Sequence, residues 1–248
     1  MDLREPTTPT QTEKSVTGSE RMRWSEVTED AVGFGTREWA TARDMLREPA
    51  LVLQRYLTLG PTGGGVYRRP FGFYMSLCGI AIFWLFLAGG ATSTVMDENG
   101  MRIIRPLLAE KGKSEEGFTN DFDDAFSALV IPMGVTLAIL FSLPLFRRWL
   151  GTTRPVAMRA ALAMFCIWSL PVLMLGPLPY LSLTRLWVMP LVYVLFLISF
   201  LRAGEGTLFH GRAQGVRRGL GVIGMMILSS IANAVPLMIV STLYGIYR

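Results

Sequence analysis

Five long apolar segments constrain what this chain can fold into more than any other feature of its sequence. Each is close to the roughly 20 residues that an α-helix needs to cross about 30 Å of hydrocarbon. The whole chain is 51% hydrophobic and 17% charged, whereas a soluble domain carries about 25% charged residues. The sequence therefore predicts an all-α, polytopic membrane protein with five transmembrane helices, at residues 71–93, 126–146, 157–179, 184–202 and 219–246.

The charged residues between these segments predict how the helices are oriented. Residues 94–125 carry eight acids and four bases, whereas the next connection carries Arg147, Arg148 and Arg154 and no acid. Basic loops stay on the cytoplasmic side, so we expect a cytoplasmic N-terminus and an extracytoplasmic C-terminus at Arg248. Only three of the 24 basic residues are lysines, a bias typical of GC-rich bacterial genomes. A bacterial inner membrane is the expected location.

Two regions of different composition precede the transmembrane domain expected over residues 71–248. Residues 1–33 are rich in Thr, Ser and Glu, and such a segment buries too little apolar surface to offset its ordering entropy, so we expect disorder. Residues 34–70 form an amphipathic cytoplasmic arm. Thr36 is suited to cap a first helix, and Pro49, which interrupts that helix, is suited to start a second. The glycine-rich run at 60–65 is expected to be a linker or a turn.

The arm is the predicted contact surface of the protein. Its arginines alternate with apolar residues, which suits a helix lying on anionic headgroups, but the same apolar face would serve for packing against the transmembrane domain. Both alternatives remain open from the sequence. The residues expected to contact a partner or lipid are Trp39, Arg43, Leu46, Arg47, Arg55, Tyr56, Arg68 and Arg69.

The acidic segment 94–125 is the one sizeable outer loop. Met101, Ile104 and Leu108 recur at helical spacing and predict a short helix that caps the outer face of the bundle. Asp121, Asp123 and Asp124 could suggest Ca²⁺, but the glycine and the distal glutamate of a twelve-residue calcium loop are missing. We expect these three acids to lie in the first turn of the second span, where they suit the helix dipole.

The expected spans contain no carboxylate, which disfavours a proton relay because such relays place ionisable groups in the membrane core. Arg159 and Arg185 are expected to anchor helix ends at the interface. The third and fourth spans contain prolines, whose freed carbonyls bind substrates in the broken helices of some transporters. Asn233 is the most polar residue of any span, and it is expected either to join helices or to bind a solute.

Residues that carry chemistry are scarce. Cys78 and Cys166 lie inside apolar runs and are expected to be free thiols, and His210 is the single histidine. This set cannot supply a tetrahedral metal site, and His210 has no neighbouring carboxylate or nucleophile with which to act as a general base. The sequence predicts no catalytic residue, no metal, no cofactor and no nucleic-acid partner.

The residues before the first span resemble those of a family of uncharacterised bacterial multi-span proteins. The resemblance rests on Leu46 to Pro49, Arg55 to Leu57, Gly60, and Tyr67 to Pro70, an order of Leu-x-x-Pro, Arg-Tyr-Leu, Gly and Tyr-x-x-Pro. Members of that family often begin with a four-cysteine zinc ribbon, which this region lacks. The five-span plan with a cytosolic arm also looks like the Yip family of membrane-trafficking and accessory proteins, in topology alone. The resemblance implies an integral membrane protein with no assigned reaction.

These features lead to two hypotheses about function. The first is a non-enzymatic accessory, scaffold or assembly protein of the inner membrane, which binds the lipid bilayer and a membrane-protein partner or a second copy of itself through the arm. The alternative is a small carrier or channel for a neutral or hydrophobic solute, which would use the proline-containing third and fourth spans and Asn233.

Overall fold

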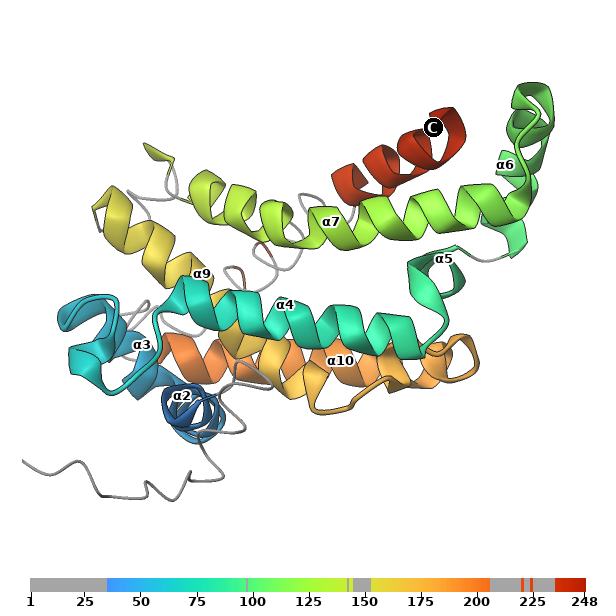
Figure 1. The fold of residues 1–248 in the computed structure, drawn as a ribbon. Helices are drawn as coiled ribbons and strands as arrows, with labels where there is room; N and C mark the ends of the chain where they lie inside the picture. Colours follow the sequence, from blue (N-terminus) through green and yellow to red (C-terminus); the bar gives the residue numbers. More distant parts are fainter. Residues whose placement is uncertain are drawn as a thin grey trace, which may run out of the picture.

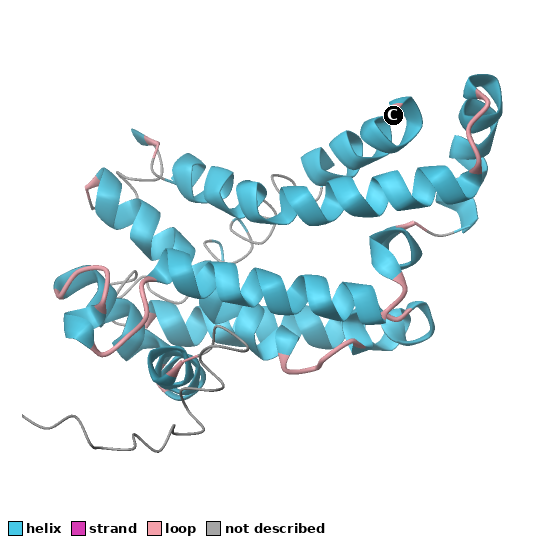
Figure 2. Cartoon of the chain, viewed as in Figure 1, coloured by secondary structure: helices cyan, strands magenta, loops and turns pink. Residues whose placement is uncertain are grey.

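A computed structural model describes residues 35–96, 98–141, 143–144, 153–205, 220, 224 and 235–248. Within these ranges the chain is helical and contains no strand, which confirms the all-α class (Figures 1 and 2). The predictions for residues 1–33, His210 and Asn233 lie outside the described residues. The elements in chain order are α2 (Thr36–Arg47), α3 (Pro49–Thr58), η1 (Gly63–Gly65), α4 (Pro70–Leu87), α5 (Gly90–Val95), α6 (Glu98–Lys111), α7 (Glu115–Phe141), α9 (Arg154–Leu173), η2 (Leu178–Tyr180) and α10 (Ser182–Gly204).

Four of the described helices are long and apolar enough to cross a membrane. They are Pro70–Leu87, Glu115–Leu140, Arg154–Leu173 and Ser182–Gly204, with mean hydropathies of 1.6 to 2.0. Each overlaps one of the first four predicted spans. A shorter apolar helix, Val235–Tyr247, falls at the end of the fifth predicted span.

Three predicted span boundaries differ clearly from the described helices, one of them because α9 ends at Leu173 rather than at 179. The first span ends at Leu87, because Gly89 adopts a left-handed conformation (φ 90°) and turns the chain into α5. The second begins at Glu115 rather than at 126, so Asp121, Asp123 and Asp124 lie beyond the first turn of the helix and do not interact with its N-terminal dipole as predicted.

Pro171 and Pro190 do not interrupt the third and fourth apolar helices, and Pro177 and Pro179, which also fall in the predicted third span, lie beyond the end of α9. Pro190 lies inside the continuous helix α10, and Pro171 lies two residues before the end of α9. Each proline removes one backbone hydrogen bond, and membrane helices tolerate that loss without unwinding.

Helix α9 is the centre of the bundle. In its apolar window 67% of the residues are buried, against 33% for α4, 22% for α10 and 19% for α7. Helices α3, α4, α7 and α10 all pack on it (Figure 1). Its buried face carries the small residues Ala157, Ala160, Ala161 and Ala163, which let neighbouring helices approach closely.

The two ends of the bundle are built from different segments. The arm lies where α4 and α9 begin and α10 ends, and α5, η2 and the start of α7 lie at the other end (Figure 1). At that other end, Thr94 donates a hydrogen bond to the Tyr180 carbonyl (3.1 Å) and Arg185 donates one to the Thr94 carbonyl. Arg185 therefore ties α10 to α5.

The aspartates of α7 also join segments at this end. Asp123 accepts hydrogen bonds from both the backbone N–H and the hydroxyl of Thr92, each at 2.7 Å. Asp121 pairs with Lys113 at 2.6 Å and with Arg248 at 3.5 Å. The C-terminal residue Arg248 therefore lies at the end of the bundle opposite to the arm.

Helices α4 and α7 are in close contact where the ring of Tyr74 packs against Gly134. The Tyr74 hydroxyl donates a hydrogen bond to the Val130 carbonyl at 3.2 Å. A Cβ atom added at Gly134 would lie 1.8 Å from that hydroxyl oxygen and 2.2 Å from Tyr74 Cζ. Only glycine leaves room for the ring at this position.

We expect Gly134→Ala to destabilise the bundle by about 1–3 kcal/mol, the usual cost of forcing an extra methyl group into a packed core. Tyr74 is buried, so its ring has little room to move. Thermal unfolding of the detergent-solubilised protein measures the effect. Gly79→Ala is the matched control, because a Cβ at Gly79 in α4 meets nothing within 4 Å. Equal stability of the two variants would contradict the close approach.

Candidate functional site

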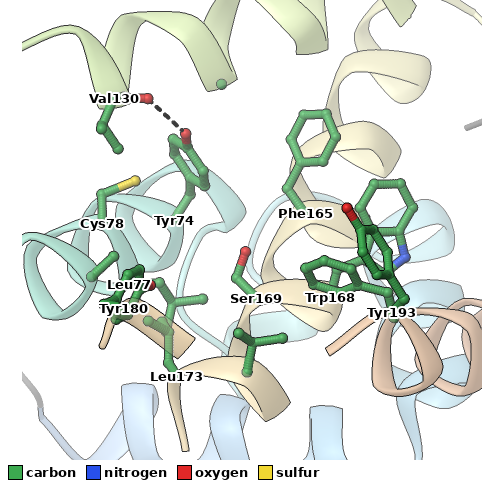
Figure 3. A pocket seen from close by; sticks show the side chains of 14 residues that line it. Tyr74, Leu77, Cys78, Val130, Phe165, Trp168, Ser169, Leu173, Tyr180 and Tyr193 are labelled. Atoms are coloured by element: carbon green, nitrogen blue, oxygen red, sulfur yellow. Dashed lines mark hydrogen bonds between the residues drawn. The ribbon is translucent and has the colours of Figure 1, made fainter. Parts of the chain in front are cut away.

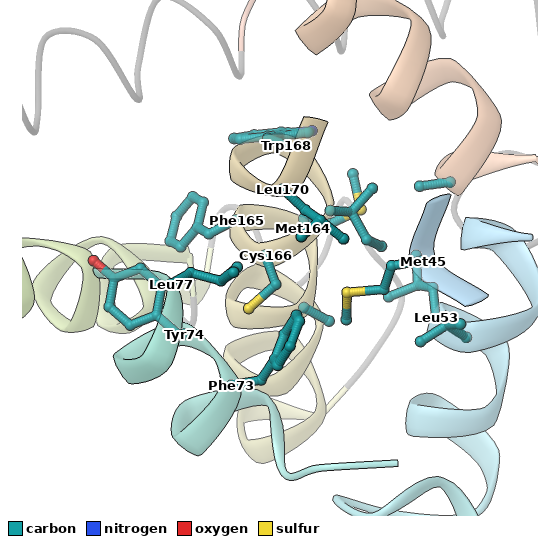
Figure 4. Close-up of a cluster of buried hydrophobic side chains, with 14 of the residues drawn as sticks. Met45, Leu53, Phe73, Tyr74, Leu77, Met164, Phe165, Cys166, Trp168 and Leu170 are labelled. Carbon is teal, nitrogen blue, oxygen red and sulfur yellow. The ribbon is translucent and has the colours of Figure 1, made fainter. Parts of the chain in front are cut away.

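The arm packs its apolar face against the bundle of long apolar helices. Val52 and Leu53 of α3 and Met45 of α2 are buried in the same cluster as Met164 of α9 and Phe73 of α4. Figure 4 shows Met45 and Leu53 facing α9 from the side of the arm. Of the two alternatives left open by the sequence, the structure shows intramolecular packing of this face.

Two arginines of the long apolar helices α9 and α10 bind carbonyls in the last turns of the arm helices. Arg202 of α10 donates hydrogen bonds to the carbonyls of Leu46 (3.0 Å) and Arg47 at the end of α2. Arg159 of α9 donates one to the Tyr56 carbonyl (3.2 Å) in the last turn of α3. The last four carbonyls of a helix have no partner within it, and positive charge is favourable there. Both arginines therefore stabilise the arm in its docked position.

A buried carboxylate joins the arm to the start of the first span. Glu38 of α2 is buried, accepts a hydrogen bond from the Gly35 N–H (3.1 Å), and pairs with Arg68 Nε (2.9 Å). The backbone of Arg68 is held as well: its N–H donates to the Thr41 hydroxyl (2.9 Å), and its carbonyl accepts from the Tyr56 hydroxyl (2.6 Å). The segment that leads into α4 is thus fixed to both arm helices.

A second polar cluster centres on Tyr67. Its hydroxyl donates to Asp44 Oδ2 (3.1 Å) and accepts from Arg55 Nη1 (3.3 Å), while Arg43 Nε pairs with Asp44 Oδ1 at 2.8 Å. The hydrogen bond from Arg43 lowers the pKa of the Asp44 carboxyl, and the bond from Tyr67 adds to this effect. Burial raises the pKa of Tyr67, and the neighbouring Asp44 raises it further. At neutral pH the cluster therefore holds an ionised Asp44 and a neutral Tyr67.

The eight predicted contact residues divide into two groups. Tyr56 is fully buried, Leu46 and Arg55 are partly buried, and Arg68 is held by Glu38. These four stabilise the docked arm. Arg68 is nevertheless exposed, as are the other four: Trp39, which is 63% exposed, Arg43, which pairs with Asp44, and Arg47 and Arg69.

The bundle also contains a pocket that the sequence did not reveal. Its volume is about 280 Å³, and α4, α7, α9 and α10 all contribute to its wall, with η2 at one side (Figure 3). None of the described residues that line it is charged. Six aromatic side chains line it: Tyr74, Phe165, Trp168, Tyr180, Tyr193 and Phe196.

Trp168 is the unusual member of this wall. The residue is 7% exposed, and its indole Nε1 has no hydrogen-bond partner among the described residues. By contrast, Trp84 donates its indole N–H to the Leu173 carbonyl at 3.2 Å. Phe165 and Trp168, and likewise Tyr193 and Phe196, are three residues apart and so share a helix face. That spacing is a signal in the sequence, but it cannot show that the two faces meet.

Metal ligands are not gathered in the described part of the chain. No group of three or more His, Cys, Asp or Glu residues could hold a metal ion there, and Cys78 and Cys166 are both free and buried. Comparisons with protein-family models, with curated proteins and with solved structures find no match for this chain. The resemblance of the arm to the multi-span family and to the Yip family stays a prediction.

We expect the arm to lose protection from amide hydrogen exchange as the pH falls below about 4. The folded pKa of Asp44 lies below its ordinary value of 3.8, so the ionised carboxylate stabilises the arm at neutral pH, and this contribution disappears as the pH falls through the folded pKa. Exchange of α2 amides at pH 7 and pH 3, corrected for intrinsic rates, measures it.

Asp44→Asn should expose the α2 amides already at pH 7 and reduce the response to acid. Asp124→Asn, an exposed position on α7, is the control for the change of charge and should behave as the unaltered protein does. An Asp44→Asn variant with full protection at both pH values would show that the Tyr67 cluster does not hold the arm.

Proposed function

We propose that the chain is a five-span, non-enzymatic protein of a bacterial inner membrane that acts by binding, as an accessory, scaffold or assembly factor. The observation that carries this proposal is the docked arm. Its apolar face is already used within the molecule, while Trp39 and several arginines remain on its surface. The arm is thus a preformed platform at one end of the bundle.

The positions of the end of α10 and of Arg248 support a fifth membrane crossing. Arg202, near the end of α10, contacts the arm, and Arg248 contacts Asp121 at the opposite end of the bundle. The chain between these two residues has to pass from one end to the other. With the arm on the cytoplasmic side, as the basic loops indicate, the C-terminus is extracytoplasmic.

Cysteine labelling with a membrane-impermeant maleimide tests this topology. Leu59→Cys in the arm and Tyr247→Cys near the C-terminus both replace exposed side chains. We expect position 59 to react only in inverted vesicles and position 247 only in intact spheroplasts. The unaltered protein, whose two cysteines are buried, gives the background. Labelling of both positions from one side would contradict five crossings.

The exposed face of α2 has the composition of a protein-binding surface. Trp39, Arg43 and Arg47 follow one another at intervals of four residues, so they lie along one face of the helix. Tryptophan and arginine are the residue types enriched at the energetic centres of interfaces, and a helix that is already ordered loses less entropy on binding. The positive charge favours a membrane-protein partner with an acidic cytoplasmic surface.

Purification in mild detergent, with cross-linking and mass spectrometry, tests this role. We expect a reproducible partner whose recovery falls at least about tenfold in the double variant Trp39→Ala/Arg47→Ala, since truncating one central interface residue costs about 2 kcal/mol. The matched control is Arg102→Ala/Ile103→Ala, which removes one cation and one exposed apolar side chain from α6 at the other end.

Two other results would count against the partner. Loss of co-purifying anionic phospholipid alone in the arm variant would assign this face to lipid headgroups. A monodisperse protein without a partner in all three preparations would favour the second candidate, a carrier or channel for a neutral or hydrophobic solute. The observation that favours that candidate is the apolar pocket between the four helices; Asn233, once expected to take part, lies outside the described residues.

A further inference from the structure

We infer that the aromatic pocket between α4, α7, α9 and α10 is a binding site for a neutral, lipid-soluble ring compound that carries a carbonyl acceptor. The juxtaposition that points to it is a buried, unpartnered indole N–H in an uncharged cavity with aromatic walls. This inference does not depend on the arm or on its partner.

The size and lining of the pocket define the shape of the ligand. Its volume of about 280 Å³ is at the lower end of the roughly 300–1,000 Å³ of small-molecule sites. A single ring system fits, whereas a whole phospholipid does not. Figure 3 shows Tyr74 on one side of the cavity and Phe165, Trp168 and Tyr193 on the other. Aromatic rings on opposite walls favour a flat ring between them, stacked or edge-on.

The indole of Trp168 defines the polar group of the ligand. An indole N–H is a donor only, so its partner has to be an acceptor. Leaving a buried donor unpaired costs about 1–3 kcal/mol, and a carbonyl oxygen on the ligand would remove that cost. Ser169, the next residue of α9, also lines the pocket (Figure 3), and its hydroxyl group can act as a second donor beside the indole N–H.

The absence of charge and the exposure of one lining residue indicate the route of entry. None of the described lining residues is charged, so an ionic ligand would be buried without a counter-ion. Tyr193 lines the pocket and is 47% exposed. It lies near the middle of α10 (Ser182–Gly204), at the depth of the hydrocarbon if that helix spans the bilayer. A ligand dissolved in the membrane reaches the pocket from there.

The test uses duroquinone and durene, which share one methylated ring and differ in the two carbonyl groups. Duroquinone has no free ring position for addition of the Cys78 thiol. Binding to the full-length protein in phospholipid nanodiscs is measured by equilibrium dialysis, and empty nanodiscs correct for partitioning. We expect saturable binding of duroquinone and weaker binding of durene.

The variant Trp168→Phe keeps an aromatic ring and removes the N–H. It should weaken duroquinone binding about fivefold, the equivalent of one neutral hydrogen bond, and leave durene binding unchanged. Trp187→Phe is the matched control, because Trp187 is 79% exposed on the outer face of α10, and it should bind both compounds as the unaltered protein does.

A second variant tests the location independently of Trp168. Ala81→Phe places a ring inside the cavity from α4 and should abolish saturable binding of both compounds. Three results would overturn the inference. They are no saturable binding of duroquinone, the same affinity for duroquinone in Trp168→Phe as in the unaltered protein, and binding of duroquinone that is no tighter than that of durene. So would unchanged binding in a folded Ala81→Phe variant.

Discussion

The rest of the structure depends on the hydrogen bonds that the last carbonyl groups of α2 and α3 accept from the helix bundle. These helices end against the bundle, and the last four carbonyls of each have no partner within their own helix. Arg202 and Arg159 reach out of α10 and α9 to bind those carbonyls, so the arm and the two transmembrane helices stabilise each other. The same contacts hold the beginning of α9 and the end of α10 at one end of the bundle.

The pocket forms because α9 lies at the centre of the bundle and the other helices pack around it. Alanines on this helix let its neighbours approach closely, and the larger Phe165 and Trp168 hold them apart further along. Because α4, α7 and α10 all pack on α9, the space beside these rings is enclosed by four helices. The close contact of Tyr74 with Gly134 draws α7 onto α4 at the same level and forms one wall.

The sequence predicts elements better than it predicts contacts. Apolar length locates four helices that are long enough to cross a membrane, and Pro49 starts the second arm helix as predicted, whereas Gly35 and not Thr36 is the N-cap of the first. The start of α7 is missed because its first residues are acidic and lie outside the apolar run. Glu38 is an ordinary first-turn acid in the sequence, yet it is buried against Arg68. Spacing within one helix could not show that contact, nor that Trp168 and Tyr193 share a cavity, because both depend on which helices become neighbours.

The most direct test of the docked arm is an electron-paramagnetic-resonance distance measurement in bilayer nanodiscs. Spin labels at Gln54 on α3 and at Leu178 in η2, both exposed, would report the position of the arm relative to the far end of the bundle, with Cys78 and Cys166 replaced by alanine. The docked arm predicts one narrow distance distribution that broadens in Arg202→Gln. It stays narrow in the control Arg37→Gln, which changes an exposed arginine in the first turn of α2. A broad distribution in the protein with Arg202 intact would contradict a fixed platform.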